Sequence, residues 1–160
     1  MPTTPGEPSE QNRYLAEHVT RLLESLRRWT GRSLVEPDQA ILDQACALFN
    51  APFVVLSHNA DEHPILNYAN RAGLNLFELS WQELIELPSR HTAEPIHQDE
   101  RARLLATVAR QGFIDDYCGI RITKSGRRFA IEQATVWNLH DENKAPYGQA
   151  ATFSSWRFLD

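Results

Sequence analysis

Residues 113–139, FIDDYCGIRITKSGRRFAIEQATVWNL, contain two segments of alternating apolar residues on either side of residues 124–127, KSGR. Because Ser-Gly is a typical chain reversal, the stretch predicts an antiparallel β-hairpin with strands at about 113–123 and 127–139. A loop of two residues and a loop of four give the same pairing, in which Ile120 faces Ile131. Opposed side chains share a face of a sheet. With this register, both strands place their large apolar side chains on one face.

The middle of that face is polar. A buried polar group without a partner costs about 1–3 kcal/mol, so these groups must bond to one another, to water or to a ligand. An apolar cavity with a few convergent polar groups is typical of a small-molecule pocket. The alternatives that stay open are a ligand pocket, the ordinary polar pairs Asp116–Thr135 and Cys118–Gln133, or a stretch that the helices leave in contact with water. The ligand-binding residues predicted by the first are Asp116, Cys118, Ile120, Phe129, Ile131, Gln133 and Thr135.

The elements around this hairpin predict an α+β domain. Two short apolar runs separated by a polar, turn-rich segment indicate a second hairpin. Asn70 is placed to cap one helix, and the pattern Ser-x-x-Glu at Ser80 is a capping box for another. The predicted strands are 53–56, 65–68 and 147–157 besides the hairpin, and the predicted helices are 37–49, 71–79, one short helix from residue 80, and 97–111.

The N-terminal region predicts a helix that ends at Gly31. Its apolar residues recur every three or four positions, as in a two-helix seam. Either the helix lies on its own domain or it contacts a second copy of the chain, and both alternatives stay open. The predicted dimer contacts are Leu15, Val19, Leu22, Leu26 and Trp29. We therefore expect a disordered tail at residues 1–9, a helical extension at 10–36 and one domain at 37–160.

Composition narrows the function classes. The net charge of -5 leaves no basic surplus for phosphates, which argues against nucleic-acid binding. No run approaches the ~18 apolar residues of a membrane-spanning helix, and the first residues lack a secretory signal. Two distant cysteines, Cys46 and Cys118, do not make a disulfide framework. The expectation is a cytoplasmic protein with reduced thiols and no membrane contact.

The usual catalytic and metal-binding patterns are missing from the sequence. Asp115 and Asp116 are neighbours on a strand and point to opposite faces, so they do not form a paired acid–base site. His91, Glu94 and His97 are interrupted by Pro95, which prevents one helix from aligning them as metal ligands. No glycine-rich phosphate loop and no nucleophile elbow is present. We expect no enzyme, no metal site, and neither flavin nor haem.

Several long stretches carry a family resemblance. They are PFVVLSH (52–58), PILNYANRAGLNLFELSWQELIELPSRHTAEP (64–95), ERARLLATVARQGFIDDYCGIRITKSGRRFAIEQATVWNLHDE (100–142) and GQAATF (148–153), with LESLRRWTGRSL (23–34) upstream. The chain resembles the MEKHLA family, a PAS-like domain found alone in bacteria and at the C-terminus of plant class III homeodomain leucine-zipper proteins. The match covers about residues 20–157, although the six-letter string that names the family is absent.

The resemblance implies a PAS-like fold, a five-stranded antiparallel sheet with flanking short helices beside a ligand cavity. It transfers no cofactor, since the cysteine motif of flavin photosensors, Asn-Cys-Arg-Phe, is missing. It implies a sensory or regulatory module that binds a small molecule, a protein partner or both, as a homodimer without an output domain of its own. A ligand-free interaction module is the alternative. A small enzyme with a cone-shaped α+β pocket, with Asp116 as base, is a third hypothesis.

Overall fold

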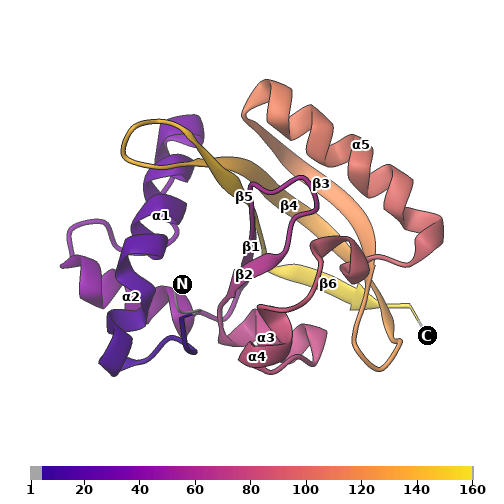
Figure 1. Ribbon diagram of the computed structural model, residues 1–160, viewed down its shortest axis with the longest axis horizontal. Helices are drawn as coiled ribbons and strands as arrows, with labels where there is room; N and C mark the ends of the chain where they lie inside the picture. Colours follow the sequence, from indigo (N-terminus) through magenta and orange to yellow (C-terminus); the bar gives the residue numbers. More distant parts are fainter. Residues whose placement is uncertain (1–4, 160) are drawn as a thin grey trace.

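A six-stranded antiparallel sheet forms the centre of the computed structural model, which describes residues 5–159 (Figure 1). Five strands follow one another in the order β2-β1-β5-β4-β3, and β6 pairs with the free part of β4. The predicted strand at 147–157 is interrupted at residue 154 and so becomes β5 and β6. The strands are β1 Val54–Asn59, β2 Leu66–Ala69, β3 Phe113–Ile122, β4 Arg128–His140, β5 Pro146–Phe153 and β6 Ser155–Phe158.

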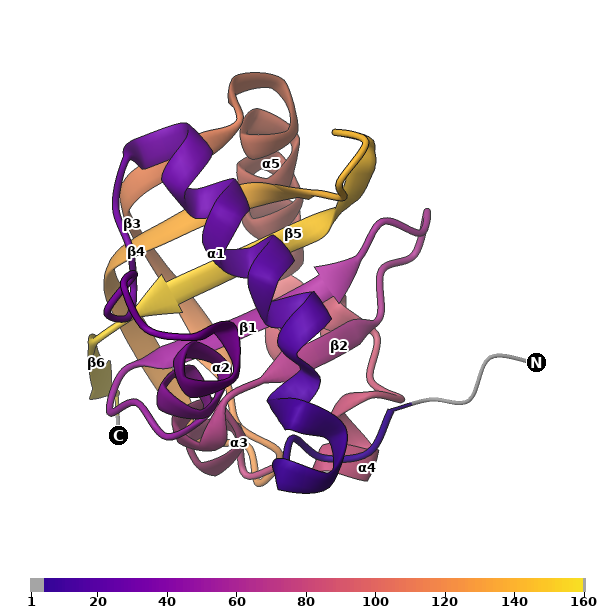
Figure 2. The same ribbon diagram turned by 90° about the vertical axis from the view of Figure 1, so that its left-hand side faces the viewer.

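Helices cover both faces of the sheet. Figure 2 shows α1 crossing in front of the sheet and α5 behind it. We call these the α1 face and the α5 face. The helical segments are η1 Glu10–Leu15, α1 Ala16–Thr30, α2 Ile41–Phe49, α3 Arg71–Phe77, α4 Trp81–Leu84, η2 Ser89–Thr92 and α5 Pro95–Gln111. The α+β class and the PAS-like five-stranded sheet expected from the sequence are confirmed.

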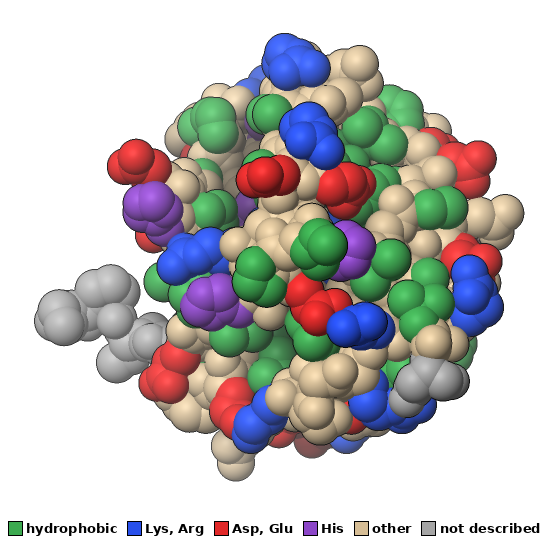
Figure 3. Space-filling model, turned by 90° about the vertical axis from the view of Figure 1, so that its right-hand side faces the viewer, with side chains coloured by type: hydrophobic (Ala, Val, Ile, Leu, Met, Phe, Trp, Pro, Cys, Tyr) green, Lys and Arg blue, Asp and Glu red, His purple; other side chains and the backbone are tan. Residues whose placement is uncertain are grey.

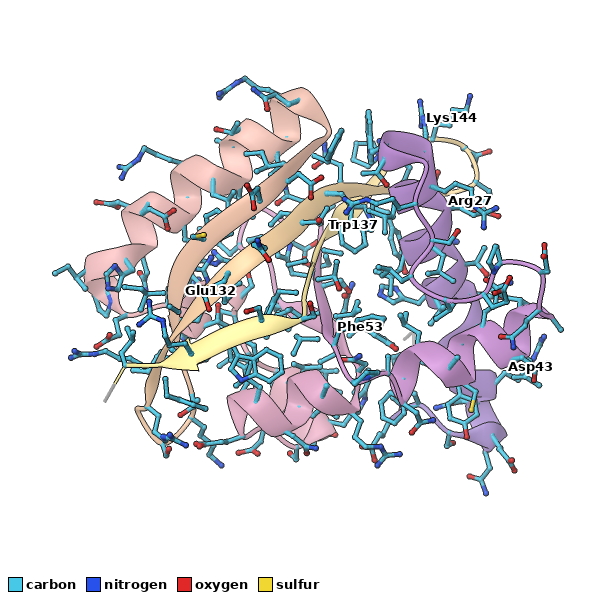
Figure 4. All side chains as sticks on the ribbon, turned by 180° about the vertical axis from the view of Figure 1, so that it is seen from behind. Arg27, Asp43, Phe53, Glu132, Trp137 and Lys144 are labelled. Carbon is cyan, nitrogen blue, oxygen red and sulfur yellow. The ribbon has the colours of Figure 1, made fainter. Side chains whose placement is uncertain are left out.

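The N-terminal helix lies on its own chain. Val19, Leu22 and Leu26 are at most 1% exposed and belong to the main core. The indole N–H of Trp137 in β4 donates to the Leu22 carbonyl oxygen at 3.2 Å, and Figure 4 shows Trp137 on the sheet beside α1. The apolar seam is therefore filled in cis, because the sheet supplies its other side.

This packing corrects the proposed dimer seam. Of its residues, Val19, Leu22 and Leu26 are buried by the same chain, while Leu15 and Trp29 are partly buried against the same core. The Trp29 indole N–H donates to the Asn138 carbonyl oxygen at 3.0 Å. These side chains do not present a free stripe to a second copy, and a homodimer by another surface stays a prediction. The expected tail is described only from residue 5, whose carbonyl oxygen accepts a hydrogen bond from Trp81.

The predicted register of the β3–β4 hairpin was wrong by one residue. The loop has three residues, closed by a 2.9 Å hydrogen bond from Thr123 N–H to the Arg127 carbonyl oxygen, with Gly126 at φ +94°. Such loops take a left-handed glycine in the last position. Ile120 therefore pairs with Ala130, and Ile131 pairs with Gly119. Because a slip of one residue exchanges the two faces, Ile120 and Ile131 lie on opposite faces of the sheet.

Asn70 joins α3 to the sheet. Its fully buried side chain accepts hydrogen bonds from the Val55 and Gly73 N–H groups at 3.0 and 3.1 Å. It donates to the carbonyl oxygens of Leu48 and Phe53 at 3.1 and 2.7 Å. The predicted cap of α3 is confirmed, and the same side chain also fixes the end of α2 and the start of β1.

Candidate functional site

A cavity of about 60 Å³ lies between α5 and the sheet. Its floor comes from the five strands β1 to β5, and its roof comes from α5, η2 and α3. Most of the lining is apolar, with arginine, histidine, tyrosine and glutamine side chains among it. The lining residues are Leu56, Ser57, His58, Leu66, Phe77, Thr92, Arg101, Leu104, Leu105, Tyr117, Arg121, Ile131, Ala134, Val136, Gln149, Ala150, Ala151 and Phe153.

The space exists because α5 packs lightly on small side chains. The buried residues of this 17-residue helix are Leu104 and Val108. Beneath the helix, β4 and β5 contribute Ala134 and Ala151 to the floor of the cavity. Close packing in protein interiors normally leaves no void larger than a water molecule. A shallow helix over two alanines is a local exception to that rule.

Two amide side chains of the sheet hold the C-terminal half of α5 in place. Gln149 in β5 donates to the Leu105 carbonyl oxygen at 3.1 Å, and Asn138 in β4 donates to the Val108 carbonyl oxygen at 3.0 Å. Gln149 also donates to the Asn138 side chain at 3.1 Å. Hydrogen bonds from these two side chains therefore hold α5 against the sheet, and the cavity lies beside them.

A wider groove of about 640 Å³ adjoins the cavity. It runs between α5 and the β1–β2 loop, and a hollow beside the α5 side chains is visible in Figure 3. Four residues line both spaces: His58, Arg101, Leu105 and Gln149. Binding pockets for small molecules are typically about 300–1,000 Å³. The cavity alone is below this range, whereas the cavity with its groove falls within it.

The two arginines of the site are held by neutral groups. Arg121 is 7% exposed and donates to its neighbour's carbonyl oxygen, that of Ile120, at 2.9 Å and to the Tyr117 hydroxyl at 3.1 Å. Arg101, partly buried, donates to the Ser89 hydroxyl at 2.8 Å. Burial, and then the charge of Arg121, lowers the pKa of Arg101 to about 10.

His58 supplies a buried acceptor. Its Nδ1 lies 2.9 Å from the Asn59 carbonyl oxygen, which can only accept, so Nδ1 carries the proton. Nε2 is then a lone-pair acceptor, and it is buried without a hydrogen-bond partner in residues 5–159. Burial, with a smaller effect from the charge of Arg101, lowers the pKa of His58 to about 4, although the hydrogen bond to the Asn59 carbonyl oxygen acts in the opposite direction. The ring is therefore neutral at physiological pH.

A second histidine links the opposite face of the same strand to α1. The Ser57 hydroxyl donates to Asn67 Oδ1 at 2.6 Å, so its oxygen accepts from His18 Nε2 at 2.9 Å. His18 Nδ1 then accepts from the Tyr147 hydroxyl at 2.9 Å. Burial, followed by the charge of Arg21, lowers the pKa of His18 to about 4. The network joins α1 to β1, β2 and β5.

The structure separates the residues that the sequence grouped as a ligand site. Ile131 lines the cavity, and Phe129 is fully buried beside it against Phe77, with ring centroids 5.2 Å apart. Asp116, Cys118 and Gln133 are exposed, and Ile120 lies on the opposite face from Ile131. Thr135 donates to Asp115, not Asp116, at 2.6 Å. The polar pairs expected at Asp116–Thr135 and Cys118–Gln133 are absent from the described hydrogen bonds.

Irregular backbone explains part of this separation. Asp116 and Gln133 have φ of 60° and 53°, and the β3–β4 register shifts on both sides of Tyr117. Each shift is a bulge that re-aims the side chains beyond it. Tyr117 is thereby turned onto the α5 face, where its hydroxyl meets Arg121.

Arg101, Arg121, His58 and Gln149 are not among the site residues predicted from the sequence. One feature of the sequence distinguishes Arg121: it stands between two isoleucines near the end of a predicted strand. With a three-residue loop, Arg121 faces Phe129 and shares its interior face. His58 is the last residue but one of β1 and is 7% exposed.

Within residues 5–159 no group of three or more His, Cys, Asp or Glu side chains is arranged to hold a metal ion. No helix in the same range has the length and apolar character needed to cross a membrane.

The MEKHLA domain model matches residues 16–158, nearly the whole described structure. The chain belongs to the MEKHLA domain family. The match includes α1, so this helix is part of the MEKHLA domain as the family defines it, although the sequence suggested an extension outside the domain.

Curated relatives of this MEKHLA domain are plant homeobox-leucine zipper proteins. ATHB-9 of Arabidopsis thaliana is 30% identical over 96 residues, which are 60% of this chain and 11% of that protein. HOX32 of Oryza sativa subsp. indica is 26% identical over 160 residues, 97% of this chain and 18% of that protein. The chain spans less than a fifth of the length of these relatives.

Solved structures similar to the MEKHLA domain are PAS and light-oxygen-voltage domains. A PAS domain from Colwellia psychrerythraea superposes with a TM-score of 0.62 at 19% identity, covering 75% of this chain and 98% of that one. The light-state dimer of the fungal blue-light photoreceptor Vivid gives 0.58 at 14% identity, covering 84% and 90%. At these identities the likeness establishes the PAS-like fold.

Proposed function

We propose that this MEKHLA domain is a sensory module that binds a small molecule beneath α5 and reports its presence at α1. One observation carries the proposal. An apolar cavity containing a partnerless buried acceptor, His58 Nε2, continues into a groove of ligand size. A buried polar atom without a partner is costly, so a bound molecule that satisfies it gains affinity.

Strand β1 supports the reporting part of the proposal. Consecutive strand residues point to opposite faces. His58 borders the cavity, and Ser57, one residue before it, accepts the hydrogen bond from His18 in α1. A ligand that shifts His58 would therefore move the residue that holds α1. In the homeobox-leucine zipper relatives the matched region is 11–18% of the protein, which fits a module that acts together with other parts of a chain.

Binding is a better account than catalysis. The candidate base of the enzyme hypothesis, Asp116, is exposed on β3 and does not line the cavity. The neutral His58 is affected by the charge of Arg101, and among residues 5–159 no carboxylate bonds to it. That arrangement positions a molecule and does not activate a nucleophile.

A thermal-shift screen with a library of small metabolites tests the binding proposal. Ala134→Leu fills the cavity from its floor and should abolish the stabilisation given by each hit. Ala130→Leu, on the opposite face of the same strand, is the matched control and should keep it. If Ala134→Leu folds normally by circular dichroism and still responds to every hit, the ligands bind elsewhere and the proposal fails.

Hydrogen exchange tests the report to α1. Bound ligand should change the exchange of α1 amides near His18 in the wild type. His18→Ala, which removes the hydrogen bond to Ser57 from the α1 side and does not touch the cavity lining, should bind the ligand and lose that change. Unchanged α1 exchange in the ligand-bound wild type would overturn this part of the proposal.

A further inference from the structure

The arginines beneath α5 are cations without anions. Neither Arg101 nor Arg121 takes part in an ion pair among residues 5–159. Their hydrogen bonds go to Ser89, to the Ile120 carbonyl oxygen and to Tyr117. Glu100 is linked to Arg121 through Tyr117, whose hydroxyl accepts from Arg121 and donates to the Glu100 carboxylate at 3.0 and 3.1 Å. Asp61 and Glu62, on the outer rim of the groove, are exposed.

Two such cations in one apolar site are unfavourable when nothing negative is bound. Removing a charge from water is unfavourable, and two like charges repel each other more strongly where the dielectric constant is low. The charge of Arg121 acts on Arg101 in the direction of this repulsion. An anion between the two guanidinium groups would remove the repulsion and supply the missing acceptors.

The rest of the lining selects the body of that anion. Leu56, Leu66, Phe77, Leu104 and Val136 surround the same space, so the part of the ligand away from its charge must be hydrocarbon. The planar fork of a guanidinium matches a carboxylate with two parallel hydrogen bonds. A free inorganic anion would leave the apolar walls uncovered.

We propose that the cavity and its groove bind a small monocarboxylate with an apolar body, whose carboxylate is held between Arg101 and Arg121. The inference rests on the proposed ligand-binding function and names the class of ligand. Arg121 lines only the inner cavity, whereas Arg101 stands where cavity and groove meet. The carboxylate therefore lies between the two guanidinium groups, and the hydrocarbon next to it covers the apolar walls of the cavity. A longer molecule has room to extend toward the groove.

Matched pairs of probes test the charge. Calorimetric titration of the whole chain with phenylacetate and hexanoate should show binding, and phenylacetamide and hexanamide, which have the same shape without the charge, should bind at least tenfold more weakly. Inorganic phosphate tests whether the charge alone suffices, and it should bind more weakly than either carboxylate.

Variants locate the site. Arg101→Gln and Arg121→Gln should each weaken phenylacetate binding at least tenfold, while Arg103→Gln, an exposed arginine on the same helix, should leave it unchanged. If Arg121→Gln does not fold, Arg121→Lys keeps the charge without the planar fork and should still weaken binding. In the wild type, phenylacetate should shift the arginine Nε–H NMR signals that are missing in Arg101→Gln.

The outcomes separate this inference from the proposed function. Equal binding of the amides, or carboxylate binding that neither arginine variant changes, would overturn the anion inference while leaving a small-molecule site beneath α5. Phosphate binding as tight as phenylacetate would show a site for an inorganic anion and would also overturn it. If no probe binds and the metabolite screen gives no hit sensitive to Ala134→Leu, both proposals fail.

Discussion

His18 should make the stability of the domain fall as the solution becomes acidic. The ring is neutral in the fold, because Nε2 donates to Ser57 and Nδ1 must keep its lone pair for the Tyr147 hydroxyl. A second proton on Nδ1 would turn an acceptor into a donor facing another donor. Burial and the nearby Arg21 oppose that proton as well, and together they lower the pKa of His18 to about 4.

The size of the effect follows from the two pKa values. A histidine in an unfolded chain has a pKa of about 6.5. Between this value and the folded value of about 4, the unfolded chain binds more protons than the folded one. The free energy of unfolding therefore falls as the pH decreases through this window, and below it His18 adds no further loss. From pH 7.5 to pH 5.0 the contribution of His18 is a loss of about 2 kcal/mol.

Urea unfolding at the two pH values measures this loss, and Trp137, buried beneath α1, is a suitable fluorescence reporter. In His18→Gln, which does not titrate, the decrease between pH 7.5 and pH 5.0 should be smaller than in the wild type by about 2 kcal/mol. Lost hydrogen bonds lower the stability of this variant at both pH values and cancel in the difference. His58, with a pKa of about 4, leaves a similar decrease in both proteins.

The control is His63→Gln, an exposed histidine, which should behave as the wild type. The same decrease in His18→Gln and in the wild type would refute the reasoning.

Three further substitutions test the packing around the site by urea unfolding at pH 7.5. Asn70→Ala should lower the free energy of unfolding by about 2–4 kcal/mol, because four buried backbone groups lose a partner; a loss below 1 kcal/mol would contradict that role. Gly148→Ala should cost about 1–3 kcal/mol, because its Cβ would lie 2.1 Å from the His58 carbonyl oxygen, and an unchanged midpoint would show that β1 and β5 can separate freely. Leu22→Ala should cost about 2–5 kcal/mol, since Leu22 is fully buried, whereas Leu42→Ala at a 40% exposed site of α2 should cost under about 0.5 kcal/mol. Equal losses in the two leucine variants would mean that α1 is not docked in solution.

Local chemistry made most of the elements predictable. The capping box at Ser80 forms as expected, with the Ser80 hydroxyl accepting from the Glu83 N–H at 3.1 Å and Glu83 accepting from the Ser80 N–H at 3.0 Å. The long helix ends at Gly112, as its sequence indicates. Each of these signals depends on residues within four positions of one another, so the sequence alone determines them.

The candidate site could not be predicted in the same way, because it depends on the choice of one loop. Loops of two, three or four residues all place Ser-Gly at the reversal, but the three-residue loop moves every partner by one position. That shift places Arg121 on the α5 face beside the cavity and leaves Asp116 exposed. The bulges at Asp116 and Gln133 then turn Tyr117 and Ala134 onto the α5 face. No local pattern specifies these bulges, since they arise where strands meet a covering helix.

The cavity and α1 are structurally connected although they lie on opposite faces of the sheet. Strand β1 contacts both: Ser57 bonds to His18 of α1, and His58 lies where the cavity meets the groove. Between these two residues the pairing of β1 with β2 shifts register, which places the Asn67 side chain within 2.6 Å of the Ser57 hydroxyl. A bulge is a point at which a strand can adjust without losing its whole ladder. Because the bulge lies between the residue that borders the cavity and the residue that bonds to α1, the proposed function predicts that a shift of His58 on ligand binding also moves Ser57 and α1.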